Sequence, residues 1–362
     1  MNPIELLRIA LGSDIAGKIS LSETECKELY SFAQKQSLIG VLFDGIERIY
    51  NHQLGQTNDI PTISKMLLLE WIGSREIIRK QNQILNERAR QLTNLFTKGG
   101  FRSCILKGQG NAVYYPQPDL RQSGDIDIWV EGDRANIVEF VKEKGVCVHD
   151  IHYVHATADF FEDVEVEIHF QPSWMYNPTT EYVLKQFFKS EGPTQFLLFD
   201  DKCGYAHPNN YFNLVYNLIH INRHIFGEGI GFRQIVDYYY ILKASNQKER
   251  NKAIQQLKKL KLYNFTSSLM YVMKECLVLD DNYLLCLPNI KQGKRLLDDI
   301  LKGGNFGKYG QYAESINKQR FNRACDSIKR NFRFILVYPE EVLWIPYFKL
   351  WHWCWRKWKG YL

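Results

Sequence analysis

Two aspartates separated by one residue are the strongest chemical signal in this sequence. Asp125 and Asp127 alternate with isoleucines in the stretch Leu120 to Val130, LRQSGDIDIWV. Residues two apart in a β-strand lie on the same face, so the carboxylates would converge while the isoleucines enter a core. Two such charges repel unless a divalent cation or another positive charge lies between them. Ser123 and Gly124, just before them, suit a tight turn whose free backbone N–H groups bind phosphate.

A second acidic segment is predicted to complete this site. In Val164 to Phe170, VEVEIHF, the polar residues Glu165, Glu167 and His169 alternate with apolar ones. If this strand lies beside that of Asp125, a glutamate completes a three-carboxylate cluster. Such a cluster suits two Mg²⁺ ions about 3.5–4 Å apart, because carboxylate oxygens are the ligands that Mg²⁺ prefers. Strand geometry alone does not separate Glu165 from Glu167.

The motif D-I-D by itself is also typical of an edge strand with solvated charges. Two further features favour a phosphate site over that alternative. Lys107 and Gly108 form a turn after an apolar strand upstream, and the acidic strand follows downstream. Together these features predict metal-dependent chemistry on a phosphate.

Helices are expected to precede these strands, in a region of residues 1–99. Ser22 and the acidic residues after it predict a helix that runs to about Gln36. A long pattern after Ser64, with apolar residues mostly seven apart, predicts a helix that packs along the next domain. Gly99 and the glycine after it mark its end.

Residues 100–172 are expected to form a small α/β sheet domain, and residues 173–362 a second helical region. The predicted elements of the sheet domain are strands Arg102 to Leu106, Asp125 to Val130, Val146 to His149, Tyr153 to Phe161 and Val164 to Phe170, with helices Gln109 to Tyr115 and Asp133 to Lys144. The clearest later helices are Asn209 to Phe226, Phe232 to Ala244, Glu249 to Leu260 and Phe265 to Cys276, and Lys302 to Gln311 is predicted to be a loop. The fold class is therefore α+β, with a small mixed sheet between helical regions.

Composition excludes several classes of protein. The chain has 362 residues, of which 45% are hydrophobic and 24% charged, as in an ordinary folded protein. Its formal charge of +6 is too small for its size to identify a polyanionic partner. The eight cysteines are scattered without a C-x-x-C pair, which argues against a zinc site or a disulfide framework. The sequence has neither a signal-peptide pattern nor a long apolar run, so a cytoplasmic protein is expected.

The order of these motifs resembles the polymerase-β-like nucleotidyltransferase superfamily. A glycine follows a strand, a helix follows the glycine, D-x-D lies on a second strand, and an acidic residue lies on a later strand. More closely, ILKGQGNAVYYPQPDLRQSGDIDIWV resembles the uncharacterised nucleotidyltransferase family found in bacterial surface-polysaccharide loci. The later segments EIHF and GIGFRQIVDYYY are similar to it as well. The resemblance covers residues from roughly 100 to 240, and it departs from the superfamily's usual Gly-Ser pair because Gln109 follows Gly108.

The resemblance implies roles for the residues that match the motifs. Asp125 and Asp127 would be metal ligands with Glu167 as the third carboxylate, preferred over Glu165 because EIHF is the matching segment. Asp127 and Glu167 would polarise the acceptor hydroxyl. The other implied roles concern the NTP: Gly108 would let the backbone approach the triphosphate, and Lys107, Arg121, Ser123 and Gly124 would hold phosphate oxygens.

A second polar cluster has no assigned role. His220 and His224 are four residues apart and share a helix face, as do Arg233 and Asp237. Nothing in the sequence supplies a third ligand for a metal at the histidines. We therefore expect Arg233 and Asp237 to form a structural ion pair.

The C-terminal segment LWIPYFKLWHWCWRKWKGYL is dense in tryptophan and basic residues. Trp351, Trp355 and Trp358 share one helical face. Helices at membrane surfaces combine these residue types, so the segment fits peripheral contact with a membrane. A terminal helix that packs its tryptophans into the core is the alternative, and stacking on nucleic-acid bases is a third.

The resemblance implies an Mg²⁺-dependent transfer of NMP from an NTP to a hydroxyl or phosphate acceptor. The sequence does not specify the acceptor; a glycan precursor of surface polysaccharide, a protein and tRNA all fit. A toxin-like enzyme that modifies tRNA is the second hypothesis, because abortive-infection nucleotidyltransferases show a similar Arg-x-Ser-x-D-I-D. A nucleotide-binding or scaffold protein without turnover is the third, and the intact carboxylates argue against it.

Overall fold

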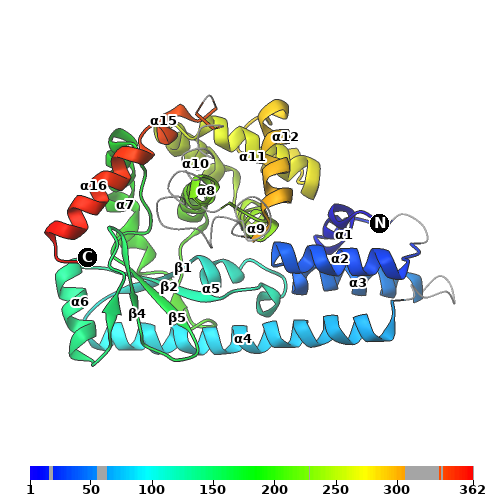
Figure 1. Cartoon of the computed structure of the whole chain (residues 1–362), viewed down its shortest axis with the longest axis horizontal. Helices are drawn as coiled ribbons and strands as arrows, with labels where there is room; N and C mark the ends of the chain where they lie inside the picture. Colours follow the sequence, from blue (N-terminus) through cyan, green and yellow to red (C-terminus); the bar gives the residue numbers. More distant parts are fainter. Residues whose placement is uncertain (16–18, 55–62, 228, 306–333, 336, 362) are drawn as a thin grey trace.

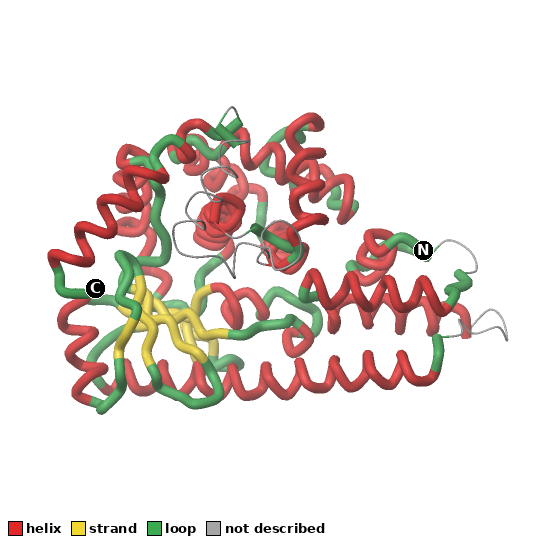
Figure 2. Tube along the Cα trace, in the orientation of Figure 1, coloured by secondary structure: helices red, strands yellow, loops and turns green. Residues whose placement is uncertain are grey.

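The computed structural model describes residues 1–15, 19–54, 63–227, 229–305, 334–335 and 337–361. One small mixed sheet lies among many helices, which confirms the expected α+β class (Figures 1 and 2). The long helix α4 runs along one side of the sheet, and the later helices lie on the other side.

The helices before the sheet are α1 (Pro3–Ala10), α2 (Glu23–Gln36), α3 (Ile39–Leu54) and α4 (Lys65–Lys98). The predicted helix after Ser22 is confirmed, and Ser22 forms a capping box with Glu25. The predicted long helix is confirmed as α4, which begins after its N-cap Ser64 and ends at Gly99.

Five short strands form the main sheet, and each lies within a predicted strand segment. They are β1 (Ser103–Leu106), β2 (Asp125–Val130), β3 (Val148–His149), β4 (His155–Ala158) and β5 (Glu165–His169), in the order β1-β2-β5-β4-β3. β2 and β5 are parallel, whereas the other neighbours are antiparallel. The helices α5 (Lys107–Ala112), α6 (Arg134–Glu143) and the 3-10 turn η1 (Pro118–Leu120) connect the strands.

Side-chain alternation along β2 divides the sheet into two faces. Ile126 and Ile128 are buried in a cluster with Leu92 and Phe96 of α4, so this face packs on the long helix. On the opposite face, Trp129 stacks on Phe212 of a later helix at 5.7 Å between ring centroids. Asp125 and Asp127 belong to that second face by the period of two.

The later helices are α7 (Pro178–Gln195), α8 (Asn210–Gly227), α9 (Phe232–Ala244), α10 (Gln247–Lys259), α11 (Tyr263–Leu277), α12 (Ile290–Gly303), α15 (Pro339–Val342) and α16 (Ile345–Trp358). A 3-10 turn η2 (Asp281–Tyr283) and a two-stranded hairpin of β6 (Phe199–Asp200) and β7 (Tyr205–Ala206) complete the described elements. The helices α8 to α11 were predicted, whereas α7, α12 and the hairpin were not. The predicted loop from Lys302 begins as the last turn of α12, and its residues 306–311 lie outside the described ones.

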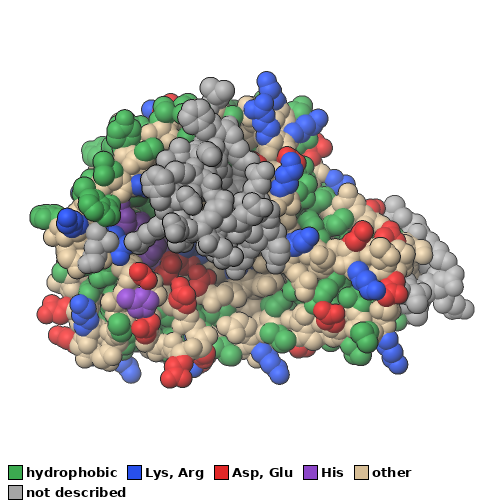
Figure 3. Space-filling view, viewed as in Figure 1, with side chains coloured by type: hydrophobic (Ala, Val, Ile, Leu, Met, Phe, Trp, Pro, Cys, Tyr) green, Lys and Arg blue, Asp and Glu red, His purple; other side chains and the backbone are tan. Residues whose placement is uncertain are grey.

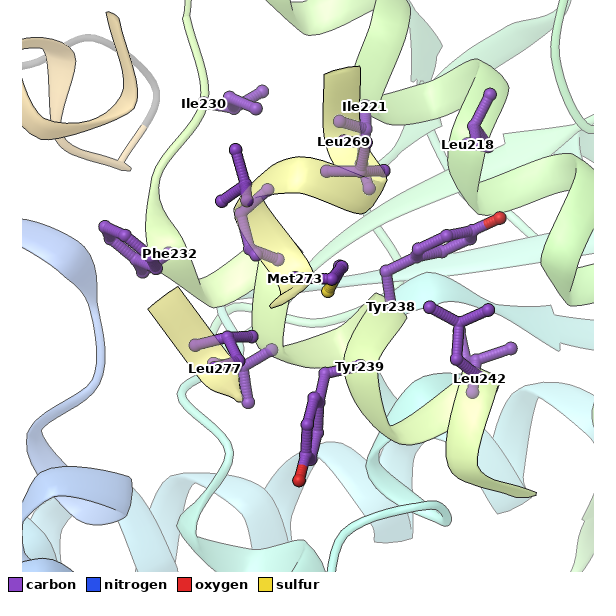
Figure 4. Packing of buried hydrophobic residues seen from close by; sticks show 14 of the residues in the cluster. Leu218, Ile221, Ile230, Phe232, Tyr238, Tyr239, Leu242, Leu269, Met273 and Leu277 are labelled. Atoms are coloured by element: carbon purple, nitrogen blue, oxygen red, sulfur yellow. The ribbon is translucent and has the colours of Figure 1, made fainter. Parts of the chain in front are cut away.

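The helices before and after the sheet share one hydrophobic core. Leu218 and Ile221 of α8, Phe232 and Tyr238 of α9 and Met273 of α11 point into this core (Figure 4). Phe32 of α2 contacts Phe232 at 6.0 Å between ring centroids, so the N-terminal helices join the same packing. This core holds α8 and α9 over the polar face of the sheet (Figure 1).

Candidate active site

The pairing of β2 with β5 brings the predicted carboxylates together. Asp127 lies opposite Glu167, and Asp125 lies opposite Glu165 in the parallel register. Glu167 lines the cavity that Asp125 and Asp127 also line, whereas Glu165 is exposed and is not among the described lining residues. The structure therefore places Glu167, as the resemblance implied, beside the two aspartates.

Lys107 and His169 both contact Asp127, which is 2% exposed. Lys107 Nζ lies 2.5 Å from Asp127 Oδ1, and His169 Nε2 lies 2.8 Å from the same oxygen. Burial lowers the pKa of Lys107, but the carboxylates around it, Asp127 first, raise that pKa by more. Lys107 is therefore a fixed positive charge at the strand end.

The remaining carboxylates differ in their surroundings. Partial desolvation by the cavity walls, followed by the charge of Asp127, raises the pKa of Asp125. Desolvation also raises the pKa of Glu167, but hydrogen bonding to His169 and the charge of Lys107 lower it by more. Glu167 thus stays ionised, whereas Asp125 adds a repulsive charge and forms no ion pair among the described residues.

Two histidines add nitrogen donors to the carboxylates. The ligand atoms of His155, Glu167 and His169 all lie within 4.8 Å of one another, a spacing at which they could hold a metal ion. His155 Nδ1 is buried and has no hydrogen-bond partner among the described residues. Burial lowers the pKa of His155 to about 4, so its ring is neutral at physiological pH and its lone pair is available to a cation.

These histidines continue as a row of rings away from the sheet. The ring of His155 lies 5.1 Å from that of His152, and His152 lies 4.0 Å from His352 of α16. Trp174 packs against His152 at 4.8 Å. Burial, and then the charge of His352, lower the pKa of His152 to about 2. We call His155, His152 and His352 the histidine row.

The turn between β1 and α5 comes close to the strand of Asp125. Gly108 has φ 4° and ψ −104°, which interrupts the helix, and a Cβ on it would lie 3.3 Å from the carbonyl oxygen of Asp125. A Cβ on Gly110 would lie 2.3 Å from the carbonyl oxygen of Ile105, so this position requires glycine. A Cβ on Gly124, in contrast, would meet nothing within 4 Å.

Arg121 forms a buried ion pair that the sequence did not predict. Its Nε and Nη2 each lie 2.7 Å from the carboxylate of Asp237, and its Nη1 donates to Ser123 Oγ at 2.5 Å. Tyr115 also donates to Asp237 at 2.6 Å. Arg233, the expected partner of Asp237, donates to the carbonyl oxygen of Gln122 at 2.8 Å. Among the described residues, Asp237 thus forms its ion pair with Arg121, because the loop before β2 reaches α9.

The carboxylates and this ion pair line one cavity of about 390 Å³. Its far wall is helical and carries polar side chains of α8 and α9, namely Asn217, His220, Arg223, His224, Arg233 and Gln234. Acidic and histidine side chains gather over the sheet in Figure 3. The cavity therefore has carboxylates on the sheet side and guanidinium groups on the helical side, an arrangement that suits a metal-bound polyphosphate.

Sequence reasoning missed several residues of this cavity. His155 alternates with alanines in HATA, and the pairing of β4 with β5 places it opposite His169. That alternation is the sequence signal from which His155 could have been assigned to the polar face of the sheet. Trp174 and Arg223 gave no signal in the sequence, since they reach the cavity only through the packing of distant segments.

A comparison with known families now identifies the chain. The sequence profile of the family described as uncharacterised nucleotidyltransferase matches residues 22–278, which is more than half of the chain. The chain belongs to this family. The match includes the carboxylates of β2 and β5 and the helical wall from α8 and α9. Membership in this nucleotidyltransferase family supports a transferase. No curated protein sequence matches the chain significantly.

Proposed function

We propose that this nucleotidyltransferase moves an NMP group from an NTP to a hydroxyl or phosphate acceptor, with two Mg²⁺ ions as cofactors. The acceptor oxygen would form a bond to the α-phosphorus, and the bond to the leaving pyrophosphate would break. The observation that carries this proposal is the convergence of Asp125, Asp127 and Glu167 in one cavity with Lys107 and Arg233.

The residues present fit a divalent cation. Asp125, Asp127 and Glu167 supply hard oxygen ligands, and Asp125 repels its neighbour Asp127 until a cation compensates both. When bound, Mg²⁺ would neutralise charge on the phosphates and activate the acceptor oxygen. His155 and His169 add nitrogen donors, so Mn²⁺ is expected to replace Mg²⁺ well.

Other residues would bind and position the nucleotide. Lys107 is a permanent cation at the turn that Gly108 opens, which suits it to hold phosphate oxygens. Backbone N–H groups at Ser123 and Gly124 would do the same. The guanidinium of Arg121 is already bound by Asp237, so we propose that Arg121 fixes the loop before β2 and contacts phosphate only with its outer edge.

The acceptor remains a choice between chemical classes. Surface polysaccharide synthesis would use a glycan precursor, whereas a toxin-like activity would use tRNA. A scaffold protein would bind NTP without turnover. Incubation of the protein with each labelled NTP and Mg²⁺, together with cell-envelope extract or total tRNA, distinguishes the three by which pool becomes labelled.

Neighbouring glutamates of β5 provide the sharpest variant test. We expect Glu167→Gln to lower the transfer rate by about 10²–10³-fold, because it removes a charge that acts on the reacting phosphate. Glu165→Gln is the matched control, since Glu165 lies on the same strand but is exposed outside the cavity. Its rate should stay within about twofold of the wild type.

Two results would overturn the proposal. One is the absence of label in every acceptor pool with every NTP. The other is an equal loss of activity in both glutamate variants. Mg²⁺-dependent NTP binding that survives Asp125→Ala and Asp127→Ala, without transfer, would instead support the scaffold hypothesis.

A further inference from the structure

The helix α16 lies on the surface, outside the residues that the family profile matches. Only Ile345 of this helix is fully buried. Its inner face rests on the sheet domain through aromatic contacts. Phe348 stacks on Trp174 at 6.0 Å, and His352 packs on His152 at 4.0 Å. These contacts fix which side of α16 faces outward.

The outward side is apolar, the reverse of an ordinary surface helix. At about 100° per residue, Tyr347, Leu350, Trp351 and Trp358 fall within roughly 100° of arc. Their exposed fractions are 68%, 63%, 45% and 79%. Hydrophobic side chains gather at the upper left of Figure 3, where Figure 1 places α16. We call these four residues, with Trp353, the outer aromatic face.

The apolar surface continues past α16 onto α7. Tyr182 of α7 is 65% exposed and lines a groove of about 420 Å³ with Trp344 and Tyr347. Contiguous exposed apolar surface of this kind marks an interaction site in a folded protein.

The charged side chains of α16 and of the residues that follow it have one sign. The segment 345–361 carries basic residues at 349, 356, 357 and 359 and contains no Asp or Glu. Lys357 lies over the Trp353 ring at 5.5 Å, and Lys359 lies over the Trp358 ring at 4.6 Å. The acidic side chain that lines the groove, Glu181, is only 14% exposed and lies 3.6 Å from Lys185. A partner that binds this surface must therefore present an apolar region bordered by negative charge.

We propose that the outer aromatic face inserts into the headgroup region of an anionic bilayer, with the helix lying in the plane of the surface. Tryptophan and lysine side chains favour this interface because their apolar parts enter the acyl boundary while their polar ends meet water and phosphate. None of the described helices is long and apolar enough to cross a membrane. A symmetric dimer through the same face would bring the lysines of two copies together, which costs free energy.

This proposal does not depend on the proposed nucleotidyl transfer, and vesicle flotation tests it separately. Full-length protein is mixed with vesicles of phosphatidylcholine alone or of phosphatidylcholine with phosphatidylglycerol. We expect binding to the anionic vesicles, weakened at high salt and accompanied by a blue shift of tryptophan fluorescence.

Variants of the outer aromatic face make the test specific. The double variant Leu350→Glu with Trp358→Glu should bind anionic vesicles at least about tenfold more weakly, because two exposed apolar anchors become charged. Leu287→Glu is the matched control, since Leu287 is 84% exposed but lies on the loop before α12. A thermal melt of each variant checks that it folds.

Three outcomes would overturn the proposal. The first is the absence of anionic-vesicle binding by the folded wild-type protein. The second is equal binding by the double variant and the control. The third is that the double variant abolishes self-association or binding to single-stranded nucleic acid while vesicle binding stays unchanged.

Discussion

The Arg121–Asp237 pair and the carboxylates of β2 and β5 line the same cavity. Only in the Arg121–Asp237 pair is the negative charge fully compensated by hydrogen-bond and ion-pair partners. The Asp237 carboxylate accepts hydrogen bonds from Arg121, Tyr115 and Asn111, so both of its oxygens are occupied. In the second group, Lys107 and His169 share one oxygen of Asp127, while Asp125 adds a further negative charge.

The difference separates a structural cluster from a reactive one. A buried pair whose hydrogen bonds are mostly made has little left to offer a ligand, although it fixes the loop that leads into β2. A cluster with surplus negative charge instead costs stability and gains it back when a cation binds. Ionisable groups whose pKa values are shifted by uncompensated neighbouring charge are found preferentially at functional sites.

Removal of one partner from the compensated pair should have the largest effect. Asp237→Leu leaves the Arg121 guanidinium buried without its counterion, so we expect a loss of about 3–5 kcal/mol in the free energy of unfolding. Urea denaturation measures it. The double variant Arg121→Met with Asp237→Leu should recover much of this loss, because no charge is left unpaired. A loss below about 1 kcal/mol in the single variant would contradict the contrast between the clusters.

Lys107 should affect activity more than stability, in contrast to Asp237. We expect Lys107→Met to lower the transfer rate by about 10²-fold, because a cation that holds the phosphates is lost. The free energy of unfolding should fall by less than in Asp237→Leu, since Asp127 keeps its contact with His169. Lys202→Met is the control, as Lys202 is exposed on the hairpin. An unchanged rate would mean that Lys107 only neutralises Asp127.

The smallest effect concerns the pH dependence of stability, because the pKa of Asp125 is raised whereas that of Asp237 is lowered. The pKa of Asp125 is raised, so its charge costs stability above that raised pKa, and the cost fades as pH falls through it toward the ordinary aspartate value. We expect Asp125→Asn to stabilise the protein at neutral pH by less than about 1 kcal/mol, because solvent in the cavity screens the charge.

Asp237 provides the comparison for this pH profile. Burial raises its pKa, but Arg121 and the hydrogen bonds lower it by more. Its stabilisation is therefore complete above the ordinary aspartate pKa and is lost as pH falls through the lowered value. Thermal melts across acidic pH measure both profiles. A gain from Asp125→Asn that grows as pH falls would show that the sign assigned to Asp125 is wrong.

The sequence predicted the elements whose signals are local. Alternation of period two located β2 and β5, and helix caps at Ser22 and Ser64 located the long helices. Parallel pairing of β2 with β5 then places Glu167 beside Asp127, as the matching motif implied. These inferences needed only neighbouring residues and the resemblance.

The sequence did not predict contacts between distant segments. Helical spacing made Arg233 the expected partner of Asp237, yet Asp237 pairs with Arg121, which is 116 residues away. The helical wall of the cavity likewise depends on how α8 and α9 pack over the sheet. Such contacts follow from the tertiary arrangement, which no local pattern records.

The histidine row gives the C-terminal helix a practical importance. His352 of α16 covers His152, and His152 in turn lies against His155 beside the glutamate of the site. A protein shortened before residue 345 would open His152 to water, and its pKa would rise from about 2 toward the ordinary histidine value. A new titratable group would then lie one ring away from the carboxylates. Measurements on proteins shortened in this way would therefore report a different electrostatic environment from that of the chain with α16.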